Sequence, residues 1–242
     1  MPMDGLEIYA DAMDASDYAP RVAETIRMLV PDVGDLLDVG AGAGQLGGAL
    51  RAADRAWTAI EPSAGMINRL RRLPAPPIVV PAGWQDAAVG DRTHDTVLAA
   101  TMPAPFQHAG VFWQRCTEWS RRSVVWVVAA HHGPRGLVLT GCLPRAWHGE
   151  DETPGIDIVT TSLAASGAPA PKHLSFVEWT FVSIVSDLER LASFLADRLG
   201  WGADDARRDD MRAHLAQQAS SCAHGYRLEI PRRSAVMLWE AA

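Results

Sequence analysis

Three glycines at alternate positions follow an acid early in the chain, in the run Asp38-Val39-Gly40-Ala41-Gly42-Ala43-Gly44. Glycine adopts positive φ readily and lets the backbone approach a ligand closely. An apolar segment precedes the run and a helical pattern follows it, so free backbone N–H groups at the helix start would face the same ligand. The spacing predicts a binding site for a small polar, ribose- or phosphate-bearing ligand at the end of a strand.

Two cofactor classes compete for this turn. Gly42-x-Gly44-x-x-Gly47 matches the dinucleotide fingerprint, but its first glycine comes two residues late after the strand. Asp38-x-Gly40-x-Gly42-x-Gly44 begins directly at the strand end. The carboxylate of Asp38 would repel a pyrophosphate, whereas it suits S-adenosylmethionine (SAM), which carries an ammonium and a sulfonium. The residues therefore favour SAM over NAD.

A second acid, Glu61, ends the next apolar segment, roughly twenty residues after the glycine turn. A carboxylate in this place accepts hydrogen bonds from both ribose hydroxyls of an adenosine. NAD sites use the same device. Glu61 therefore predicts an adenosine-containing cofactor without choosing between SAM and NAD.

The segments around these acids resemble the motifs of the class I SAM-dependent methyltransferases. The resembling segments are Leu37-Asp38-Val39-Gly40-Ala41-Gly42-Ala43-Gly44, Ile60-Glu61-Pro62-Ser63-Ala64-Gly65-Met66 and His94-Asp95-Thr96-Val97-Leu98, with His94 in place of an aromatic residue. The resemblance covers about residues 20–130. It implies a methyltransferase whose last strand is antiparallel and lies between the fifth and the sixth.

The resemblance also implies a role for the residues around the cofactor. Asp38 would hold the methionine amino group through water, and Glu61 would bind the ribose hydroxyls. Trp84 would stack on the adenine, although packing in the core is an equal alternative for it. The expected cofactor-binding set is Asp38, Gly40, Ala41, Gly42, Gly44, Glu61, Pro62, Met66, Trp84, Gln85, Asp86 and Thr101.

Methyl transfer is a direct displacement that depends mainly on positioning. A base is needed only when the acceptor must lose a proton. His131 and His132 end the fifth apolar segment and are the predicted catalytic residues, because either could take that proton near neutral pH. The alternative is that one caps the strand and the other is solvated. No metal is expected, because adjacent histidines on a strand point to opposite faces.

The loop after the fourth apolar segment, from Thr101 to Phe106, should face the methyl group. Enzymes that methylate the amino groups of nucleic-acid bases carry Asn, Asp or Ser, then Pro-Pro and an aromatic residue here. Thr101-Met102-Pro103-Ala104 lacks that arrangement, and the net charge of -7 also argues against a nucleic-acid partner. A small-molecule methyl acceptor is predicted, with an O, N or S nucleophile left open.

Alternating strand and helix patterns position these residues. Strands are expected at 36–39, 57–60, 77–80, 96–100, 124–130, 176–185 and 235–240, and late helices at 158–165, 186–199 and 204–218. Residues before Pro20 read as irregular or partly helical. The pattern predicts an α/β fold, a seven-stranded, mostly parallel twisted sheet with helices on both faces (Rossmann-like). We expect a single domain, 1–242, with a substrate-cap insertion at about 133–172.

The remaining composition indicates where the protein works. Three widely spaced cysteines, none at metal-ligand spacing, indicate a reduced, cytoplasmic setting. Residues 1–19 lack the apolar core of a signal peptide, and no apolar run reaches membrane-spanning length. An exposed tryptophan in the 133–172 segment, Trp147, would serve a homodimer face as readily as a pocket.

Two other functions stay open. A non-catalytic SAM-binding regulatory or partner subunit would keep the same glycine turn and Glu61. An NAD-linked oxidoreductase would need a catalytic set such as Tyr-x-x-x-Lys, but Ala168 stands four residues before Lys172. The predicted function is therefore a SAM-dependent methyltransferase.

Overall fold

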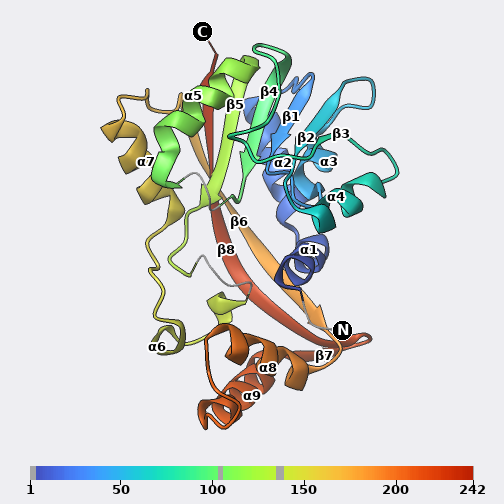
Figure 1. Ribbon diagram of the computed structural model, residues 1–242, viewed down its shortest axis with the longest axis vertical. Helices are drawn as coiled ribbons and strands as arrows, with labels where there is room; N and C mark the ends of the chain where they lie inside the picture. Colours follow the sequence, from blue (N-terminus) through green and yellow to red (C-terminus); the bar gives the residue numbers. More distant parts are fainter. Residues whose placement is uncertain (1–3, 103–105, 135–138, 242) are drawn as a thin grey trace. The chain divides into compact units, whose positions relative to one another are not determined.

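The computed structural model describes residues 4–102, 106–134 and 139–241 (Figure 1). The chain divides into two compact units. The larger unit comprises Tyr18–His131, Pro154–Trp179 and Arg232–Ala242, and the smaller one Met1–Asp17, His132–Thr153 and Thr180–Pro231. Every predicted cofactor-binding residue belongs to the larger unit.

A mixed sheet carries the fold, with the strand order β3-β2-β1-β4-β5-β8-β6 and β7 paired to β8. The strands are β1 (Leu36–Val39), β2 (Trp57–Ile60), β3 (Ile78–Val80), β4 (His94–Ala100), β5 (Ser120–Ala129), β6 (His173–Val185), β7 (Ser220–Cys222) and β8 (Gly225–Glu240). β1 to β5 pair in parallel, and β8 runs antiparallel to β5. The predicted α/β fold is confirmed, including the antiparallel last strand inserted between the fifth and the sixth.

Helices alternate with these strands. They are α1 (Gly5–Ala15), α2 (Tyr18–Leu29), α3 (Gln45–Leu50), α4 (Ala64–Arg71), α5 (Ala109–Trp119), α6 (Arg145–His148), α7 (Gly155–Ala165), α8 (Leu188–Arg198) and α9 (Arg207–Gln218), with short 3-10 turns η1 (Phe106–His108) and η2 (Thr140–Cys142). In the larger unit α2 packs on α3, and α5 packs with α7 against β5. In the smaller unit α8 packs on α9.

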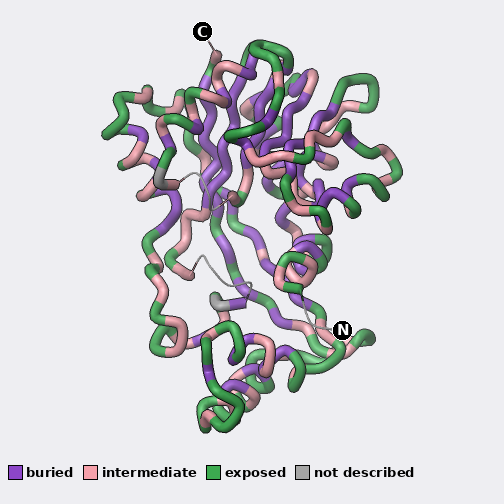
Figure 2. Tube along the Cα trace, in the orientation of Figure 1, coloured by how far each residue is buried: buried purple, intermediate pink, exposed green. Residues whose placement is uncertain are grey.

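Side-chain alternation along β1 decides which face each residue serves. Leu37 and Val39 enter a buried cluster that also holds Phe112 of α5 and Trp126 of β5. Figure 2 shows how strongly the burial concentrates in these strands. Within the cluster, Phe112 meets Trp84 and Trp126 edge-on at 5.1 and 4.8 Å between ring centroids. Each such aromatic pair contributes about 1 kcal/mol beyond its buried area.

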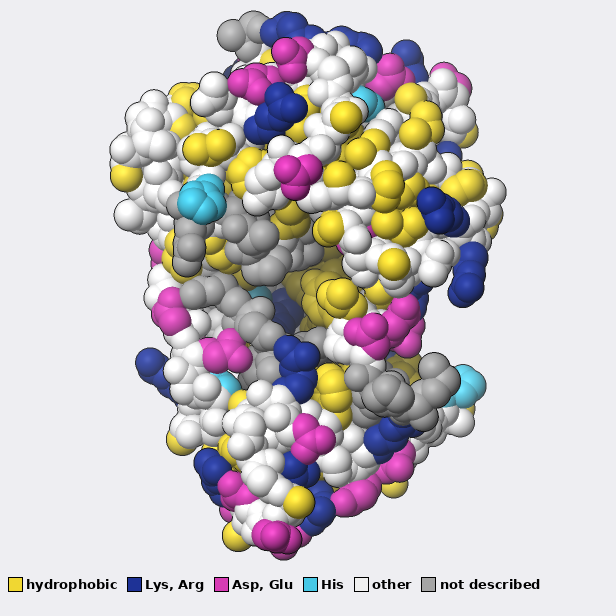
Figure 3. Space-filling model, in the orientation of Figure 1, with side chains coloured by type: hydrophobic (Ala, Val, Ile, Leu, Met, Phe, Trp, Pro, Cys, Tyr) yellow, Lys and Arg dark blue, Asp and Glu magenta, His cyan; other side chains and the backbone are white. Residues whose placement is uncertain are grey.

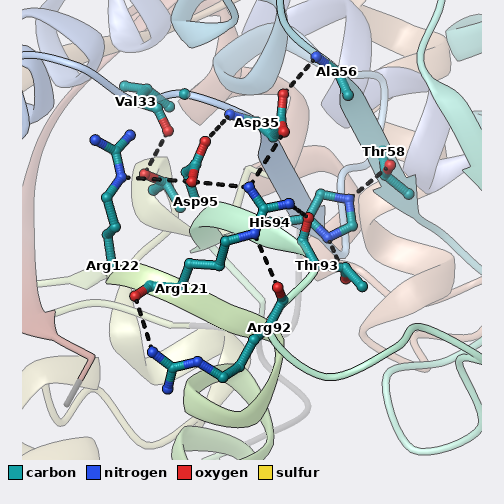
Figure 4. Close-up of polar contacts among 12 residues, drawn as sticks. Val33, Asp35, Ala56, Thr58, Arg92, Thr93, His94, Asp95, Arg121 and Arg122 are labelled. Atoms are coloured by element: carbon teal, nitrogen blue, oxygen red, sulfur yellow. Dashed lines mark hydrogen bonds and ion pairs between the residues drawn. The ribbon is translucent and has the colours of Figure 1, made fainter.

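An ion-pair network ties the amino ends of β1, β4 and β5 together (Figure 4). Arg121 Nη1 lies 3.1 Å from Asp95 Oδ1, and the other Asp95 oxygen accepts the N–H of Asp35 at 2.9 Å. Partial burial raises the pKa of Asp95, but the Asp35 N–H, Arg122 and Arg121 outweigh it and hold that pKa below its usual value. Since the carboxyl ends of the strands face away from it, this network supports the sheet rather than a ligand.

His94, which replaces the expected aromatic residue, is buried in the same region. Its Nδ1 lies 2.9 Å from Thr93 Oγ1 and its Nε2 2.9 Å from Thr58 Oγ1. Because each ring nitrogen has a hydroxyl partner, these hydrogen bonds offset the cost of removing the polar ring from water. The pKa of His94 is lowered, because the effect of burial is larger than the opposing effect of the Asp35 charge.

The chain ends depart from the sequence-based expectation. The segment before Pro20 contains a full helix, α1, because Asp4 accepts the Leu6 N–H at 2.9 Å and Met13 is buried. The last strand begins at Gly225 rather than at residue 235 and forms a hairpin with β7. The predicted insertion is divided, since 133–153 lie in the smaller unit while α7 packs on α5. That it caps the site stays a prediction.

Within the described ranges no helix is long and apolar enough to cross a membrane. The same ranges contain no group of three or more His, Cys, Asp or Glu residues that could hold a metal ion.

Candidate functional site

The glycine turn begins immediately after β1, whose last residue is Val39. Gly40, Gly42 and Gly44 all have positive φ, at 67°, 57° and 84°. The N–H of Gly40 donates to the Ile60 carbonyl at 2.8 Å, which joins the turn to the end of β2. A turn that starts at Gly40 fits the Asp38-x-Gly40-x-Gly42-x-Gly44 reading of the sequence.

Of the three glycines in the turn, only Gly42 has open space beside it among the described residues. A Cβ on Gly42 would meet no heavy atom of the described residues within 4 Å. One on Gly40 would lie 2.5 Å from the Met102 sulfur, and one on Gly44 2.6 Å from a Leu70 methyl carbon. The backbone at Gly42 is therefore the point where a ligand can approach the turn most closely.

Asp38 points to the face of β1 that α3 covers. A Cβ on Gly47 would lie 2.1 Å from Asp38 Oδ2, so only glycine leaves room for this carboxylate. Asp38 is buried, and its pKa is raised from 3.8 to about 7: burial raises it most, the charge of Glu61 raises it as well, and the Trp57 indole lowers it. The carboxylate thus lacks the solvation it needs, and a nearby cation would favour its ionised form.

Glu61 lies directly after β2 and is 6% exposed. Its Oε2 accepts the Gly42 N–H at 2.9 Å, and its Oε1 accepts the Ser63 N–H at 2.8 Å. These two bonds fix the carboxylate against the open part of the turn. Because a carboxylate offers about four lone-pair sites, it can also accept ribose hydroxyls.

The other predicted cofactor residues lie in two groups. Pro62, Gln85 and Asp86 are exposed, while Ala41 is partly exposed. Met66 is buried in the first turn of α4, where its N–H lies 3.5 Å from the capping Ser63 hydroxyl. Their roles toward the adenine stay predictions.

Trp84 is buried in the core, where its ring meets Phe112. Its indole N–H has no hydrogen-bond partner in the part of the chain that the structure describes. A buried donor without a partner costs stability. Its ring serves the core, and its role beside the adenine stays a prediction.

Thr101 directly follows β4 and has a strained backbone conformation. Its φ is +55°, which is uncommon for a β-branched residue, and its N–H donates to the Val127 carbonyl at 3.0 Å. Met102 follows and lies against Gly40. Strain of this kind often gathers at binding sites. Residues 103–105 of the predicted methyl-facing loop lie outside the described residues.

His131 and His132, the predicted catalytic pair, follow β5. Both ring nitrogens of His131 have partners, since Nε2 lies 2.9 Å from Arg232 Nη1 and Nδ1 lies 3.0 Å from the Arg233 carbonyl oxygen. His132 is exposed and belongs to the smaller unit. With its nitrogens engaged, His131 is the weaker candidate base of the two.

Sequence reasoning missed three residues of this region. Gly47 gives room to Asp38, Met102 packs on the turn, and Arg232 contacts His131. Gly47 carried a visible signal as the third glycine of the dinucleotide fingerprint, which serves close packing of a helix on a strand. Arg232 carried none, because it is about a hundred residues away in sequence from His131.

No protein-family model and no curated protein matches the sequence. Solved structures with a similar fold include several candidate methyltransferases. A candidate type II methyltransferase from Anaeromyxobacter dehalogenans is 17% identical, with a TM-score of 0.58 over 91% of this chain and 95% of that one. A candidate methyltransferase from Bacillus halodurans is 11% identical, with a TM-score of 0.55 over 92% and 99%.

A third similar structure is a candidate methyltransferase from an antibiotic biosynthesis pathway of Anabaena variabilis. It is 16% identical, with a TM-score of 0.54 over 90% of this chain and 97% of that one. At such identities the likeness concerns the fold. The chain therefore has the Rossmann-like fold of the class I methyltransferases, as its motifs predicted.

Proposed function

We propose that the protein is a SAM-dependent methyltransferase that acts on a small molecule. The observation that carries the proposal is a pair of buried acids, Asp38 and Glu61, next to a glycine turn that is open at Gly42. Burial and, second to it, the nearby Glu61 raise the pKa of Asp38, so a cationic ligand beside these two carboxyl groups would be favoured.

SAM fits these residues better than a dinucleotide does. Its ammonium would restore the ionised form of Asp38, and its ribose hydroxyls would donate to the lone pairs that Glu61 keeps beyond its two backbone bonds. The pyrophosphate of NAD would instead bring two negative charges to the turn beside Asp38. Like charges at such short range are costly in a site of low dielectric constant.

In the reaction, SAM supplies the electrophilic methyl group and the chain supplies position. Asp38 would hold the ammonium of the methionine part and Glu61 the ribose hydroxyls, and Gly42 would let the backbone approach the cofactor. An acceptor that enters as a neutral amine or a thiolate needs no base. An acceptor that must lose a proton would need one, and His131 and His132 stay the predicted residues for that role.

The small-molecule acceptor is inferred from surface charge. In Figure 3 lysine and arginine side chains are interspersed with acidic ones over the visible face, and the net charge is -7. Binding to a phosphate backbone depends on clustered basic side chains. A cytoplasmic location and a homodimer stay predictions.

The test is formation of S-adenosylhomocysteine (SAH) from SAM, measured by mass spectrometry with a panel of small amines, thiols, phenols and carboxylic acids. Gly42→Val, which fills the approach to the turn, is expected to abolish SAH formation. The matched control Gly48→Ala should preserve it, because its Cβ would meet the Trp57 ring at an ordinary 3.6 Å.

Acceptor-dependent SAH formation that Gly42→Val abolishes would support the proposal. SAM binding without turnover across the panel would favour the non-catalytic SAM-binding subunit. Reduction of NAD, or binding of NAD and not SAM, would overturn the cofactor assignment.

A further inference from the structure

Trp57 is the first residue of β2 and lies on the same face of the sheet as Asp38. In the parallel register of β1 and β2, Leu36 pairs with Trp57 and Asp38 pairs with Ala59. Paired residues of neighbouring strands share a face of the sheet, and so do residues two apart on one strand. Both side chains are buried, with 5% of Trp57 and 3% of Asp38 exposed. The two therefore point together toward the side that α3 covers.

Glycines at the start of α3 make room for the Trp57 ring. A Cβ on Gly44, the N-cap residue, would lie 3.1 Å from Trp57 Cη2, and one on Gly48 would lie 3.6 Å from the same atom. A Cβ on Gly47 would instead meet two polar atoms, Asp38 Oδ2 at 2.1 Å and Trp57 Nε1 at 2.9 Å. The indole ring therefore lies along α3, with its N–H end beside the Asp38 carboxyl group.

The N–H of Trp57 is a buried donor. No acceptor of the described residues meets hydrogen-bond geometry with it. It nevertheless acts on Asp38, whose pKa is raised mainly by burial and next by the Glu61 charge, whereas the Trp57 indole lowers it. A buried donor without a partner is costly, and a donor bonds more strongly to an ionised carboxylate than to a neutral group. The indole is therefore placed to pair with Asp38 once Asp38 loses its proton.

We propose that Trp57 is a positioning residue for SAM, whose indole N–H donates to the Asp38 carboxylate and so favours the ionised form that the methionine ammonium needs. This inference rests on the proposed function, which supplies the ammonium. The indole suits the role because it is a donor only, so it does not compete with Asp38 as an acceptor. Its packing along α3 fixes the direction of that donor.

The first experiment measures SAH affinity by calorimetry at pH 6 and pH 8.5, because SAH keeps the ammonium and is not consumed. Trp57→Phe keeps an aromatic ring and removes the N–H. With the pKa of Asp38 moved from about 7 to about one unit higher, the variant should bind SAH about tenfold more weakly at pH 6 and within about twofold of the wild type at pH 8.5. A packing defect alone would weaken binding by the same factor at both pH values.

Trp119→Phe is the matched control. Trp119 is also buried, and its N–H also lacks a partner among the described residues, but it belongs to the cluster that holds Leu37 and Val39, on the other face of β1. Its replacement should leave the pH dependence of SAH affinity unchanged. In the Asp38→Asn background, Trp57→Phe should have no pH-dependent effect, because the group on which it acts no longer ionises.

A ligand-free measurement tests the same contact if Trp57→Phe does not fold. The chain has nine tryptophans, whose indole N–H signals can be followed by proton–nitrogen correlation NMR of the wild type from pH 5 to pH 8.5. One indole signal should move downfield with a midpoint near pH 7 as Asp38 ionises. Asp38→Asn should abolish that movement, and the signal that Trp119→Phe removes should not move.

Three results would overturn the inference: an equal loss of SAH affinity at both pH values in Trp57→Phe, the same pH-dependent loss in Trp119→Phe, or no indole signal that titrates with Asp38. SAH binding that Trp57→Phe leaves unchanged at pH 6 would reject this inference and leave the proposed function standing. A titrating indole signal in a protein that binds neither SAM nor SAH would reject the proposed function and leave the Trp57–Asp38 contact standing.

Discussion

Replacing Asp38 by asparagine should make the ligand-free protein more stable while weakening its hold on SAM. The pKa of the buried carboxyl is about 7 in the folded chain, against an ordinary value of 3.8. A buried acid with a raised pKa destabilises the fold most at pH values above that pKa, where the folded protein must hold it ionised. As pH rises from 3.8 through 7, the unfolded chain gives up the proton first, so stability falls across that window.

The size of the effect follows from the same pKa. One pKa unit corresponds to about 1.4 kcal/mol, so the rise from 3.8 to about 7 corresponds to roughly 4 kcal/mol at pH 8. Asn keeps the shape of Asp and removes this charge, so Asp38→Asn should raise stability at pH 8 by up to that amount. For a chain of 242 residues this is a rise of roughly 10 °C in Tm.

The assay is thermal unfolding of wild type and Asp38→Asn without ligand, at pH 5 and pH 8. The gain in Tm should be clearly larger at pH 8. SAM affinity of the wild type should fall as pH drops below 7, because binding the ammonium then requires loss of the Asp38 proton; the variant should bind SAM at least tenfold more weakly at pH 8. A variant that is less stable than wild type at pH 8, or equally stabilised at both pH values, would refute the reasoning.

Four other substitutions test the surroundings of the turn. Glu61→Ala should weaken SAM binding by more than about tenfold in calorimetry, because charge-assisted bonds to the ribose and to the Gly42 N–H are lost; unchanged affinity would reject the ribose assignment. Gly47→Ala should lose about 1–3 kcal/mol in urea unfolding, since its Cβ would lie 2.1 Å from Asp38 Oδ2. Gly48→Ala in the same helix should instead gain about 0.5–1 kcal/mol, and equal behaviour of the two would contradict the tight contact. Thr101→Gly should gain up to about 1 kcal/mol in the same assay by relieving the positive φ; a clear loss would mean that the conformation is not strained.

The central fold was predictable because several local signals agree there. The apolar runs that became β1 and β2 are short, continuous and bounded by turns, which indicates buried parallel strands. The glycines and Glu61 then marked the ligand-binding edge. Since each of these signals is local in sequence, reading the chain once was enough to find them.

The last strand shows what obscured the rest. Leu228 and Ile230 are buried and alternate with polar residues, which is a period-two signal. Pro231 interrupts the run, and a proline argues against a strand interior. β8 nevertheless continues through it, where the chain passes from the smaller unit to the larger. The pattern was present, but one residue that usually ends a strand concealed it.

The partners of His131 could not have been found from the sequence. Its contacts with Arg232 and Arg233 depend on the antiparallel pairing of β5 and β8, which sets Ala129 opposite Ser234. No local pattern encodes that register. The sequence could place a histidine at the end of a strand, but only the tertiary structure reveals that both of its nitrogens are engaged.

The most direct test of the account is thermal unfolding of the purified protein with SAM, SAH, NAD and NADP, each in large excess. A ligand at about 100 times its Kd adds roughly 2.7 kcal/mol to stability. For 242 residues this corresponds to a rise in Tm of roughly 5–10 °C. The account predicts that rise with SAM or SAH and none with NAD or NADP. A rise with NAD or NADP alone would contradict it, and would mean that Gly42-x-Gly44-x-x-Gly47 is a dinucleotide-binding motif.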